Sequence, residues 1–340
     1  MSFIDASSRI GLDAALAALR AAAEPTRLRV LALLAEGELT VSDLTDILGQ
    51  SQPRISRHLK LLVEAGLVER RREGAWAFFG LTEIAPIKQA TVAALDRLDP
   101  ADAALARDRE RLAEVRAAHH DAAARYFSAQ ATRWDGVRSL HVAETAVERA
   151  ILDILGDRRV ETALDLGTGT GRVLELLSPQ VGRAIGIDSN RDMLSLARAN
   201  LARAGVANAQ VRQGDIFALP VPADSFDLVV VHQVLHFLDD GARAVREAAR
   251  ALSAGGRLLI VDFAPHGIEE LREAHAHRRL GFSNDTMAGW LSAAGLDVVA
   301  HIQLPPPDGA ADKLTVSLWL ARDPRIVADA PLSPSKLEVA

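Results

Sequence analysis

Apolar strand-like runs alternate with helical stretches from Val160 onward, and no other feature of the chain constrains its fold as strongly. The strand-like runs read TALDLG, AIGID, AQVRQGD, FDLVVVHQVL and GRLLIVDF, and helical stretches such as RDMLSLARANLARA stand between them. Strands that alternate with helices form βαβ units and a parallel sheet. Near the end, LDVVAHIQL and KLTVSLWLA flank a loop rich in proline and glycine, and we expect them to close the sheet as an antiparallel pair. The sequence therefore predicts an α/β domain with a seven-stranded sheet.

A glycine-rich turn follows the first of these strands. Asp165 to Gly171 read DLGTGTG and open the next helix. Glycine is needed there because the backbone turns sharply and a ligand must approach it without a Cβ in the way. Asp188 ends the second strand, where a carboxylate can accept from two ribose hydroxyls. Asp215 ends the third and is placed to accept from an adenine amino group. These positions predict a site for a nucleoside-containing cofactor.

Two cofactor classes suit such a turn, a dinucleotide and S-adenosylmethionine. Asp165 stands at the mouth of the turn, where its charge would repel a pyrophosphate. The same charge would attract the ammonium and sulfonium groups of S-adenosylmethionine. The sequence therefore favours a methyltransferase, and a dinucleotide-binding domain is the chief rival.

All five segments resemble the class I S-adenosylmethionine-dependent methyltransferases, over residues 160 to about 320. The resemblance implies a Rossmann-like fold and a small-molecule methyl acceptor. Ala254 departs from the family, which usually has proline before the paired glycines, and leaves that turn feasible. The residues that the resemblance carries to the cofactor are Asp165, Gly167, Gly169 and Gly171 at the methionine end, Asp188 at the ribose, Asp215 and Ile216 at the adenine, and His232 and Gln233 near the methyl group.

Methyl transfer by in-line displacement needs no covalent nucleophile. Holding the acceptor in line can supply ~7 to 11 kcal/mol of the barrier. If the acceptor must lose a proton, His232 or His236 could serve as the base, and packing is the alternative role for both. The segment YFSAQATRWDG resembles the lid of many small-molecule methyltransferases, with Tyr126 and Trp134 as candidate lid contacts and hinge packing as the alternative.

A helix-turn-helix pattern precedes this domain. Leu16, Leu19 and Ala23 recur at helical spacing, and Pro25 stands early in a second helix. A third helix reads VSDLTDIL, and after a break at GQ a fourth reads SQPRISRHLKLLVEAG, with Ser51 as its N-cap. The segment LVERRREGAWAFFGLT then predicts two strands, a hairpin that we call the wing.

The basic residues gather in this region although the whole chain has a net charge of −6. Residues 51–72 hold six basic and two acidic side chains, a local balance of +4. In the fourth helix Ile55, Leu59 and Leu62 share a face that packs, and the opposite face can read DNA. Trp76 stands in the wing, where it can contact the DNA backbone or the minor groove. The predicted DNA contacts are Gln52, Arg54, Ser56, Arg57 and Lys60 in the helix, and Arg70, Arg71 and Arg72 in the wing.

This region resembles the ArsR family of winged-helix repressors over nearly its full length. The resemblance implies a homodimer that binds double-stranded, palindromic operator DNA. Arsenic-responsive members carry cysteines in the third helix, where this chain has Thr40, Ser42 and Thr45. Hydroxyls replace soft thiolates poorly, so we expect no soft-metal sensing there. The run HHD at residues 119–121 favours a plain helix surface, and we assign no metal to the chain.

The remaining segments set the expected boundaries. Alanine-rich, charged helices between about residues 82 and 121 suit connectors with solvated faces or a dimer-forming pair. The segment REAHAHRRLGFS, with His275, His277, Arg278 and Arg279, favours a solvated helix face. There is no leader and no membrane-length apolar run, so we expect a cytoplasmic protein without a membrane partner. The expected parts are a winged-helix domain at 1–100, a helical linker and lid at 101–140, a methyltransferase domain at 141–322 and a flexible tail at 323–340.

Three functions fit these parts. The first is a transcriptional regulator whose methyltransferase domain methylates a small acceptor. The second is a sensor of S-adenosylmethionine or S-adenosylhomocysteine that controls DNA binding without turnover. The third is a methyltransferase whose winged helix serves only dimerisation, and the intact recognition helix counts against it. The sequence does not separate the first two.

Overall fold

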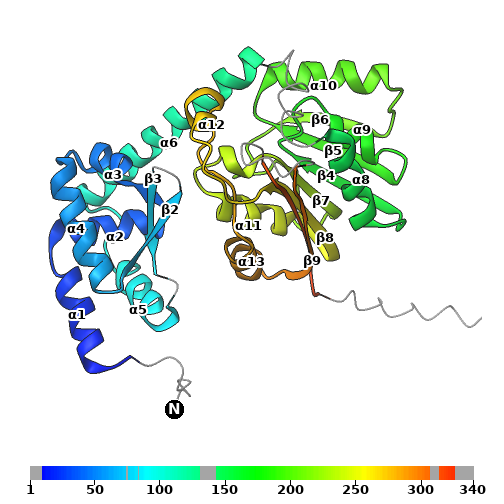
Figure 1. Cartoon of the computed structure of the whole chain (residues 1–340). Coiled ribbons are helices and arrows are strands. Elements are labelled where there is room, and N and C mark those ends of the chain that lie inside the picture. The colour runs from blue at the N-terminus through cyan, green and yellow to red at the C-terminus, as the bar shows by residue number, and fades with distance from the viewer. Residues whose placement is uncertain (1–9, 74–75, 83, 131–142, 307–313, 326–340) are drawn as a thin grey trace, which may run out of the picture. The chain divides into compact units, whose positions relative to one another are not determined.

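The chain folds into two compact units (Figure 1). The computed structural model describes residues 10–73, 76–82, 84–130, 143–306 and 314–325. Unit 1 consists of Met1–Tyr126, His236–Asp240 and Pro265–Leu280. Unit 2 consists of Phe127–Leu235, Gly241–Ala264 and Gly281–Ala340. Two short segments that lie between strands of the methyltransferase region in sequence thus belong to unit 1, which the sequence did not predict. The boundaries that we expected from the sequence stay predictions.

Unit 1 contains the predicted helix-turn-helix and wing (Figure 1). Its three strands form a sheet in the order β1-β3-β2, with both pairings antiparallel. The strands are β1 (Leu39–Thr40), β2 (Val68–Glu73) and β3 (Trp76–Leu81). The helices are α1 (Leu12–Ala22), α2 (Pro25–Ala35), α3 (Val41–Leu48), α4 (Gln52–Glu64), α5 (Ala85–Leu95), α6 (Ala103–Gln130), whose last residues belong to unit 2, and α12 (Glu270–His275).

Polar side chains fix the ends of the short helices. The Glu24 carboxylate accepts the N–H of Arg27 at 2.8 Å and caps α2. Thr40 and Asp43 form a capping box at the start of α3, since each side chain accepts the other's backbone N–H. Gly49 ends α3 with φ of +63°, a conformation that glycine adopts without strain. Thr40, at one of the family's cysteine positions, is therefore used as a helix cap.

The core of unit 1 includes more of the chain than the sequence predicted. The apolar face of α4 is buried, as its spacing predicts. Leu112 of α6 joins this core with 3% exposure. Arg29 of α2 donates from both Nε and Nη2 to Asp108 of α6, at 2.6 and 2.5 Å. Neither role expected for this region, a solvated connector or a dimer-forming pair, included the core leucine and the part-buried ion pair that the first half of α6 supplies.

Unit 2 has the predicted seven-stranded sheet, in the order β6-β5-β4-β7-β8-β10-β9. The first five strands pair in parallel, and β10 is antiparallel to both β8 and β9. The prediction of a closing antiparallel pair is confirmed. The strands are β4 (Val160–Leu166), β5 (Val181–Asp188), β6 (Ala209–Gln213), β7 (Phe226–His232), β8 (Leu252–Phe263), β9 (Asp297–Leu304) and β10 (Val316–Arg322).

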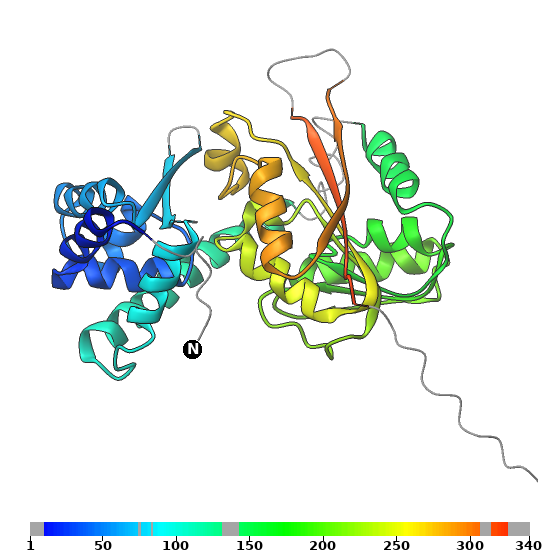
Figure 2. The same cartoon turned by 90° about the horizontal axis from the view of Figure 1, so that it is seen from below.

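Helices cover both faces of this sheet (Figures 1 and 2). One group is α8 (Glu144–Leu155), α9 (Arg172–Leu177) and α10 (Arg191–Arg203), and the second is α11 (Gly241–Ala251) and α13 (Asn284–Ala293). In the first group α9 and α10 pack on β5 and β6 and α8 contacts β10, and the second group packs on β7, β8 and β9. The central strands are buried on both faces and read as continuous apolar runs, as parallel strands do. Within the described residues, no helix has the length and apolar character needed to cross a membrane.

Candidate cofactor pocket and nucleic-acid interface

The carboxyl ends of four parallel strands meet at one edge of the unit 2 sheet. Leu166 at the end of β4 pairs with Ile187 of β5 and with Val231 of β7. Asp188, the last residue of β5, pairs with Gln213, the last of β6. The residues that follow these strands therefore lie along one edge, where open α/β sheets bind their ligands. The structure thus brings together the cofactor residues predicted from four separate stretches of sequence.

The glycine-rich turn has the backbone that its sequence predicts. Gly167, Gly169 and Gly171 have φ of +70°, +51° and +83°, in the left-handed region that favours glycine. A Cβ on Gly167 would collide with the Val234 side chain. Asp165 is 3% exposed and accepts the hydroxyl hydrogen of Thr168 at 2.6 Å. The turn is therefore built for close approach, with a buried carboxylate at its base.

The Asp188 carboxylate is fixed against this turn. Its Oδ2 accepts the N–H of Gly169 at 2.9 Å, and its Oδ1 accepts the N–H of Asn190 at 2.8 Å. Asp215 is exposed and accepts the N–H of Phe217 at 2.9 Å, while the neighbouring Ile216 is half-buried. These residues fit a cofactor with a diol, a cationic end and an exposed base.

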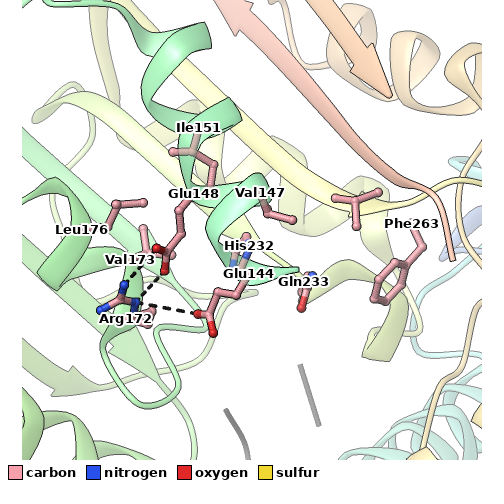
Figure 3. Close-up of a pocket in the computed structure, with 11 residues that line it drawn as sticks. Glu144, Val147, Glu148, Ile151, Arg172, Val173, Leu176, His232, Gln233 and Phe263 are labelled. Atoms are coloured by element: carbon pink, nitrogen blue, oxygen red, sulfur yellow. Dashed lines mark hydrogen bonds and ion pairs between the residues drawn. The ribbon is translucent and has the colours of Figure 1, made fainter. Parts of the chain in front are cut away.

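A pocket lies beside the turn, between α8, the first turns of α9 and the ends of β7 and β8 (Figure 3). Figure 3 shows its charged side chains on one side and Phe263 on the other. Asp188 and Asp215 do not line it, whereas Arg172 and Val173, which directly follow the glycine-rich turn, and Gln233 do. The lining residues are Glu144, Glu148, Arg172, His232 and Gln233, which are polar, and Val147, Ile151, Val173, Leu176, Phe263 and Val316, which are apolar.

An ion cluster at this pocket was missed from the sequence. Arg172 donates from Nε and Nη2 to the two oxygens of Glu148, at 2.6 and 2.9 Å. Glu175 lies 3.1 Å and Glu144 3.8 Å from the same guanidinium. The hydrogen bond to Glu148 is the main cause that raises the pKa of Arg172. The signal was present, because two glutamates stand four apart on a helix and an arginine directly follows the glycine turn.

The two candidate bases lie in different places. His232 lines the pocket with Gln233, which adopts a left-handed φ of +54° although it is not glycine. Such a backbone is uncommon for a non-glycine residue and is found at functional sites. His236 belongs to unit 1, is 2% exposed and stacks on Phe237 and His277 at ring-centre distances of 4.0 and 4.2 Å. His236 is thus packed inside unit 1, whereas His232 lines the pocket, and a catalytic role for either stays a prediction.

Only one of the two candidate lid aromatics can be placed. The Tyr126 hydroxyl is 2.7 Å from Nδ1 of His275, and both residues belong to unit 1. Burial raises the pKa of Tyr126. Trp134 lies outside the described residues. The structure thus gives Tyr126 a packing contact, which was the alternative role.

The predicted reading face of α4 is exposed. Ile55, Leu59 and Leu62 point into the core. His58 is half-buried, 3.7 Å from Glu24, and burial is the main cause that lowers its pKa. The exposed side chains of this helix include those predicted to contact DNA, which are Gln52, Arg54, Ser56, Arg57 and Lys60.

The wing arginines differ from one another. Arg70 and Arg72 are exposed, whereas Nη1 of Arg71 lies 2.9 Å from Glu38. Arg71 therefore has a partner inside the unit that its neighbours on the strand do not share. The guanidinium of Arg272 lies 4.6 Å from the ring centre of Trp76. The Trp76 ring therefore has a contact within unit 1. The sequence predicted a DNA contact for Trp76 and gave no sign of this partner.

Two segments that were expected to be helix surfaces make contacts within unit 1. Arg279 and His277 are 3% and 8% exposed, so the solvated face expected for their segment was wrong. The Nδ1 atom of His119 lies 3.0 Å from Asp239, and its Nε2 lies 3.6 Å from Asp43. Burial tends to raise the pKa of Asp239, but His119 and Arg278 outweigh it and lower that pKa. Sequence spacing could not reveal these contacts, because the partners are far apart along the chain.

Comparison with known proteins gives each region a family. Residues 24–70 match the model of the bacterial regulatory protein arsR family, and residues 164–260 match that of a methyltransferase domain. A stretch of 109 residues is 38% identical to the uncharacterized methyltransferase YcgJ of Bacillus subtilis (strain 168), covering 32% of this chain and 43% of that protein. A stretch of 132 residues is 36% identical to the ubiquinone/menaquinone biosynthesis C-methyltransferase UbiE of Enterobacter sp. (strain 638), covering 38% and 53%.

The chain spans about half the length of the curated relatives it matches. Among solved structures it is similar to a putative methyltransferase of Haloferax volcanii, determined in complex with the Trm112 methyltransferase activator. That likeness has a TM-score of 0.50 at 22% identity and covers 58% of this chain and 98% of that chain, which supports the fold alone. The chain therefore joins an ArsR-family helix-turn-helix region to a class I methyltransferase domain in a single polypeptide.

Proposed function

We propose that the chain is a DNA-binding transcriptional regulator whose second unit binds S-adenosylmethionine and methylates a small acceptor. The observation that carries the cofactor assignment is the Asp188 carboxylate, held at the end of β5 by the N–H of Gly169. This contact joins the acid predicted for the ribose to the turn predicted for the methionine end. Buried Asp165 adds the negative charge that suits a cationic ligand.

The bound cofactor supplies a methyl group on a positively charged sulfur. The protein's part is to hold the acceptor in line with that group, and positioning of this kind contributes ~7 to 11 kcal/mol. His232 and Gln233 line the pocket beside the turn, so they are the residues that hold the acceptor. His232 takes the proton from an acceptor that must lose one, because an imidazole is a base near neutral pH.

The pocket indicates the size and character of the acceptor. Six of its lining side chains are apolar, and its charged residues include the paired Arg172 and Glu148. Apolar walls with a few polar groups are typical of small-molecule sites. An acceptor with an apolar body and one nucleophilic atom directed at His232 fits this lining.

The first unit is proposed to bind operator DNA as a homodimer. The exposed face of α4 enters the major groove, and Arg70 and Arg72 of the wing contact phosphates. Leu12 and Leu19 of α1 are 75% and 67% exposed, and Leu16 between them is 37% exposed. These leucines line one face of the helix, which suits burial against a second copy of the chain.

Binding and turnover are tested on the full chain. Isothermal titration with S-adenosylmethionine should give a binding signal, and NAD should neither bind nor compete. A duplex selected by the chain from a randomised library should bind with a half-site spacing of about one helical turn. Small-molecule fractions of a cell extract are then supplied as methyl acceptors. Release of S-adenosylhomocysteine is the readout, and His232→Gln is the matched variant. Tight binding of NAD would overturn the methyltransferase assignment.

The alternative function is a sensor of S-adenosylmethionine or S-adenosylhomocysteine that controls DNA binding without turnover. What favours it is that His236–Asp240 and Pro265–Leu280 come from the methyltransferase region in sequence and belong to the DNA-binding unit. Saturable cofactor binding with no S-adenosylhomocysteine release from any fraction is the result that selects the sensor. Release that depends on His232 selects the enzyme.

A further inference from the structure

Two segments of unit 1 begin directly after residues that line the pocket of unit 2. His236 is three positions after Gln233, and Pro265 is two positions after Phe263. Gln233 and Phe263 both line the pocket. A ligand that displaces either of these residues therefore displaces the start of a segment that is folded into the DNA-binding unit.

The segment 265–280, which we call the latch, packs on the aromatic side chains of the wing. The guanidinium of Arg272 lies 4.6 Å from the ring centre of Trp76, and that of Arg278 lies 5.4 Å from it. Arg279 lies 4.2 Å from the ring centre of Phe78. The side chains of these arginines are between 3% and 14% exposed. Three cations, of which Arg279 is buried and the other two are half-buried, thus rest on two rings of one strand, β3, in the geometry of cation–π contacts.

Carboxylates tie the latch to the wing and to the helix-turn-helix. Glu38 accepts from Arg279 at 2.7 Å and also contacts Arg71 of the wing at 2.9 Å. Asp239 accepts from Arg278 at 2.8 Å and lies 3.0 Å from His119. The same Arg278 lies 3.8 Å from Asp43, which caps α3. The latch therefore pairs directly with Asp43 of α3, and it is linked to Arg71 of the wing and to His119 of α6 through the shared carboxylates of Glu38 and Asp239.

These contacts favour two discrete states over gradual movement. A buried arginine that loses its carboxylate leaves an uncompensated charge, which is strongly unfavourable. The latch must then either keep all of these partners or lose them together, with water taking their place. A packed element of this kind is bistable, so a small displacement at one end is passed on as a shift of the whole.

We propose that the latch couples the methyltransferase pocket to the wing, so that a ligand in the pocket changes the position of the wing and with it the affinity for DNA. This inference rests on the proposed function, because it takes the ligand to be S-adenosylmethionine or its product, whose methyl end is expected beside His232 and Gln233 of the pocket. The route starts at Phe263 in the pocket and continues along the latch to the ion pairs that Arg278 and Arg279 make. Coupling of this kind is typically about 5- to 150-fold.

The test compares hydrogen exchange of the full chain with and without S-adenosylmethionine. In the wild type, saturation should change the exchange of residues 163–170, of the latch and of β3. Arg279→Gln removes the contacts to Glu38 and Phe78, so we expect it to keep the response at 163–170 and lose the response at β3. Arg279→Lys retains the charge and should restore part of the β3 response.

Two further variants separate coupling from folding. Arg29→Gln breaks the Arg29–Asp108 pair, which lies in the same unit and outside the latch, so it should keep the β3 response. Trp76→Leu removes the ring under two latch arginines and should lose that response even if Arg279→Gln fails to fold. In parallel, the affinity for the selected duplex is measured with and without S-adenosylmethionine. The ratio of the two affinities should fall toward 1 in Arg279→Gln and Trp76→Leu and stay at the wild-type value in Arg29→Gln.

The outcomes distinguish the latch from the function on which it rests. If residues 163–170 respond to the ligand and β3 does not, or if β3 still responds in Arg279→Gln and Trp76→Leu, the latch proposal is wrong and the cofactor site stands. If no segment responds because the ligand does not bind, the proposed function fails at its cofactor and the latch fails with it.

Discussion

Asp188 is the residue on which the cofactor site depends most. It accepts from Gly169 of the turn and from Asn190, the N-cap of α10, and it is proposed to accept from the ribose hydroxyls. Its role could be predicted because an acid at the end of the second strand is a local sequence signal. The contact with Gly169 could not, because the sequence does not specify how the turn orients its N–H groups.

Replacement of Asp188 by alanine should weaken S-adenosylmethionine binding by about 1.5 to 3 kcal/mol, since it removes a charged acceptor from two hydroxyls. Titration calorimetry measures the loss. Asp192→Ala, which removes an exposed carboxylate from the first turn of α10, is the matched control and should bind nearly as the wild type does. Equal affinities for the two variants would show that Asp188 does not contact the cofactor.

His58 predicts how the stability of unit 1 depends on pH. Burial lowers its pKa below the usual 6.5, so the unfolded chain binds a proton more readily than the folded one. Unfolding therefore becomes easier as pH falls through 6.5 toward the lower folded pKa, and this contribution is constant above 6.5. Burial also lowers the pKa of His301 in unit 2. That residue is the same in the wild type and in the His58→Gln variant with which it is compared.

The free energy of unfolding should thus drop between pH 7.5 and 5.5 by more in the wild type than in His58→Gln. Urea titrations at the two pH values measure both drops. An equal drop in the two proteins would mean that His58 titrates alike in the folded and unfolded chain.

At the scale of elements, the sequence predicted most of the fold because its signals are local. Periodicity placed the strands of unit 2, and Ser51 stands at the N-cap of α4 as predicted, although its side chain makes no capping hydrogen bond. The wing was predicted as a hairpin, and its partners were not. Trp76 and Arg71 contact residues that stand far from them along the chain, and spacing within a hairpin carries no information about such contacts.

The recognition helix can be tested through Arg57, which is exposed on α4. Arg57→Ala should weaken binding of the selected duplex by about 1 to 3 kcal/mol and relax the preference for one base pair, while cofactor affinity stays unchanged. Arg107→Ala removes an exposed arginine from α6 and serves as the control. Unchanged duplex affinity in Arg57→Ala would show that this residue does not read bases.

The wing arginines should differ in their dependence on salt. Arg70 is exposed and proposed to contact a phosphate, so Arg70→Ala should lower the slope of log affinity against log salt by about 1. Arg71 is paired with Glu38, so Arg71→Ala should leave the slope nearly unchanged and lower the melting temperature instead. A slope that changes equally in both variants would contradict this difference between neighbouring residues.

At the scale of the whole molecule, the division into units is what the sequence could least predict. Residues 236–240 and 265–280 stand between strands of a continuous α/β pattern, and that pattern assigns them to the methyltransferase domain. Their membership of unit 1 depends on buried ion pairs such as Arg279 with Glu38, which are 241 positions apart. Such pairs follow from tertiary packing, and no periodicity in one sequence encodes them.

The central claim is that the cofactor pocket and the DNA-reading surface of this chain affect one another. Titration of S-adenosylmethionine into the free chain and into the chain saturated with the selected duplex tests it most directly. Linkage requires the duplex to change cofactor affinity by the same factor by which the cofactor changes duplex affinity, and about 1 to 3 kcal/mol is the usual scale. The account predicts two displaced isotherms. The ratio of their cofactor dissociation constants should equal the ratio of the duplex dissociation constants measured without and with cofactor. Superimposable isotherms would contradict it and leave a regulator and a methyltransferase that only share a chain.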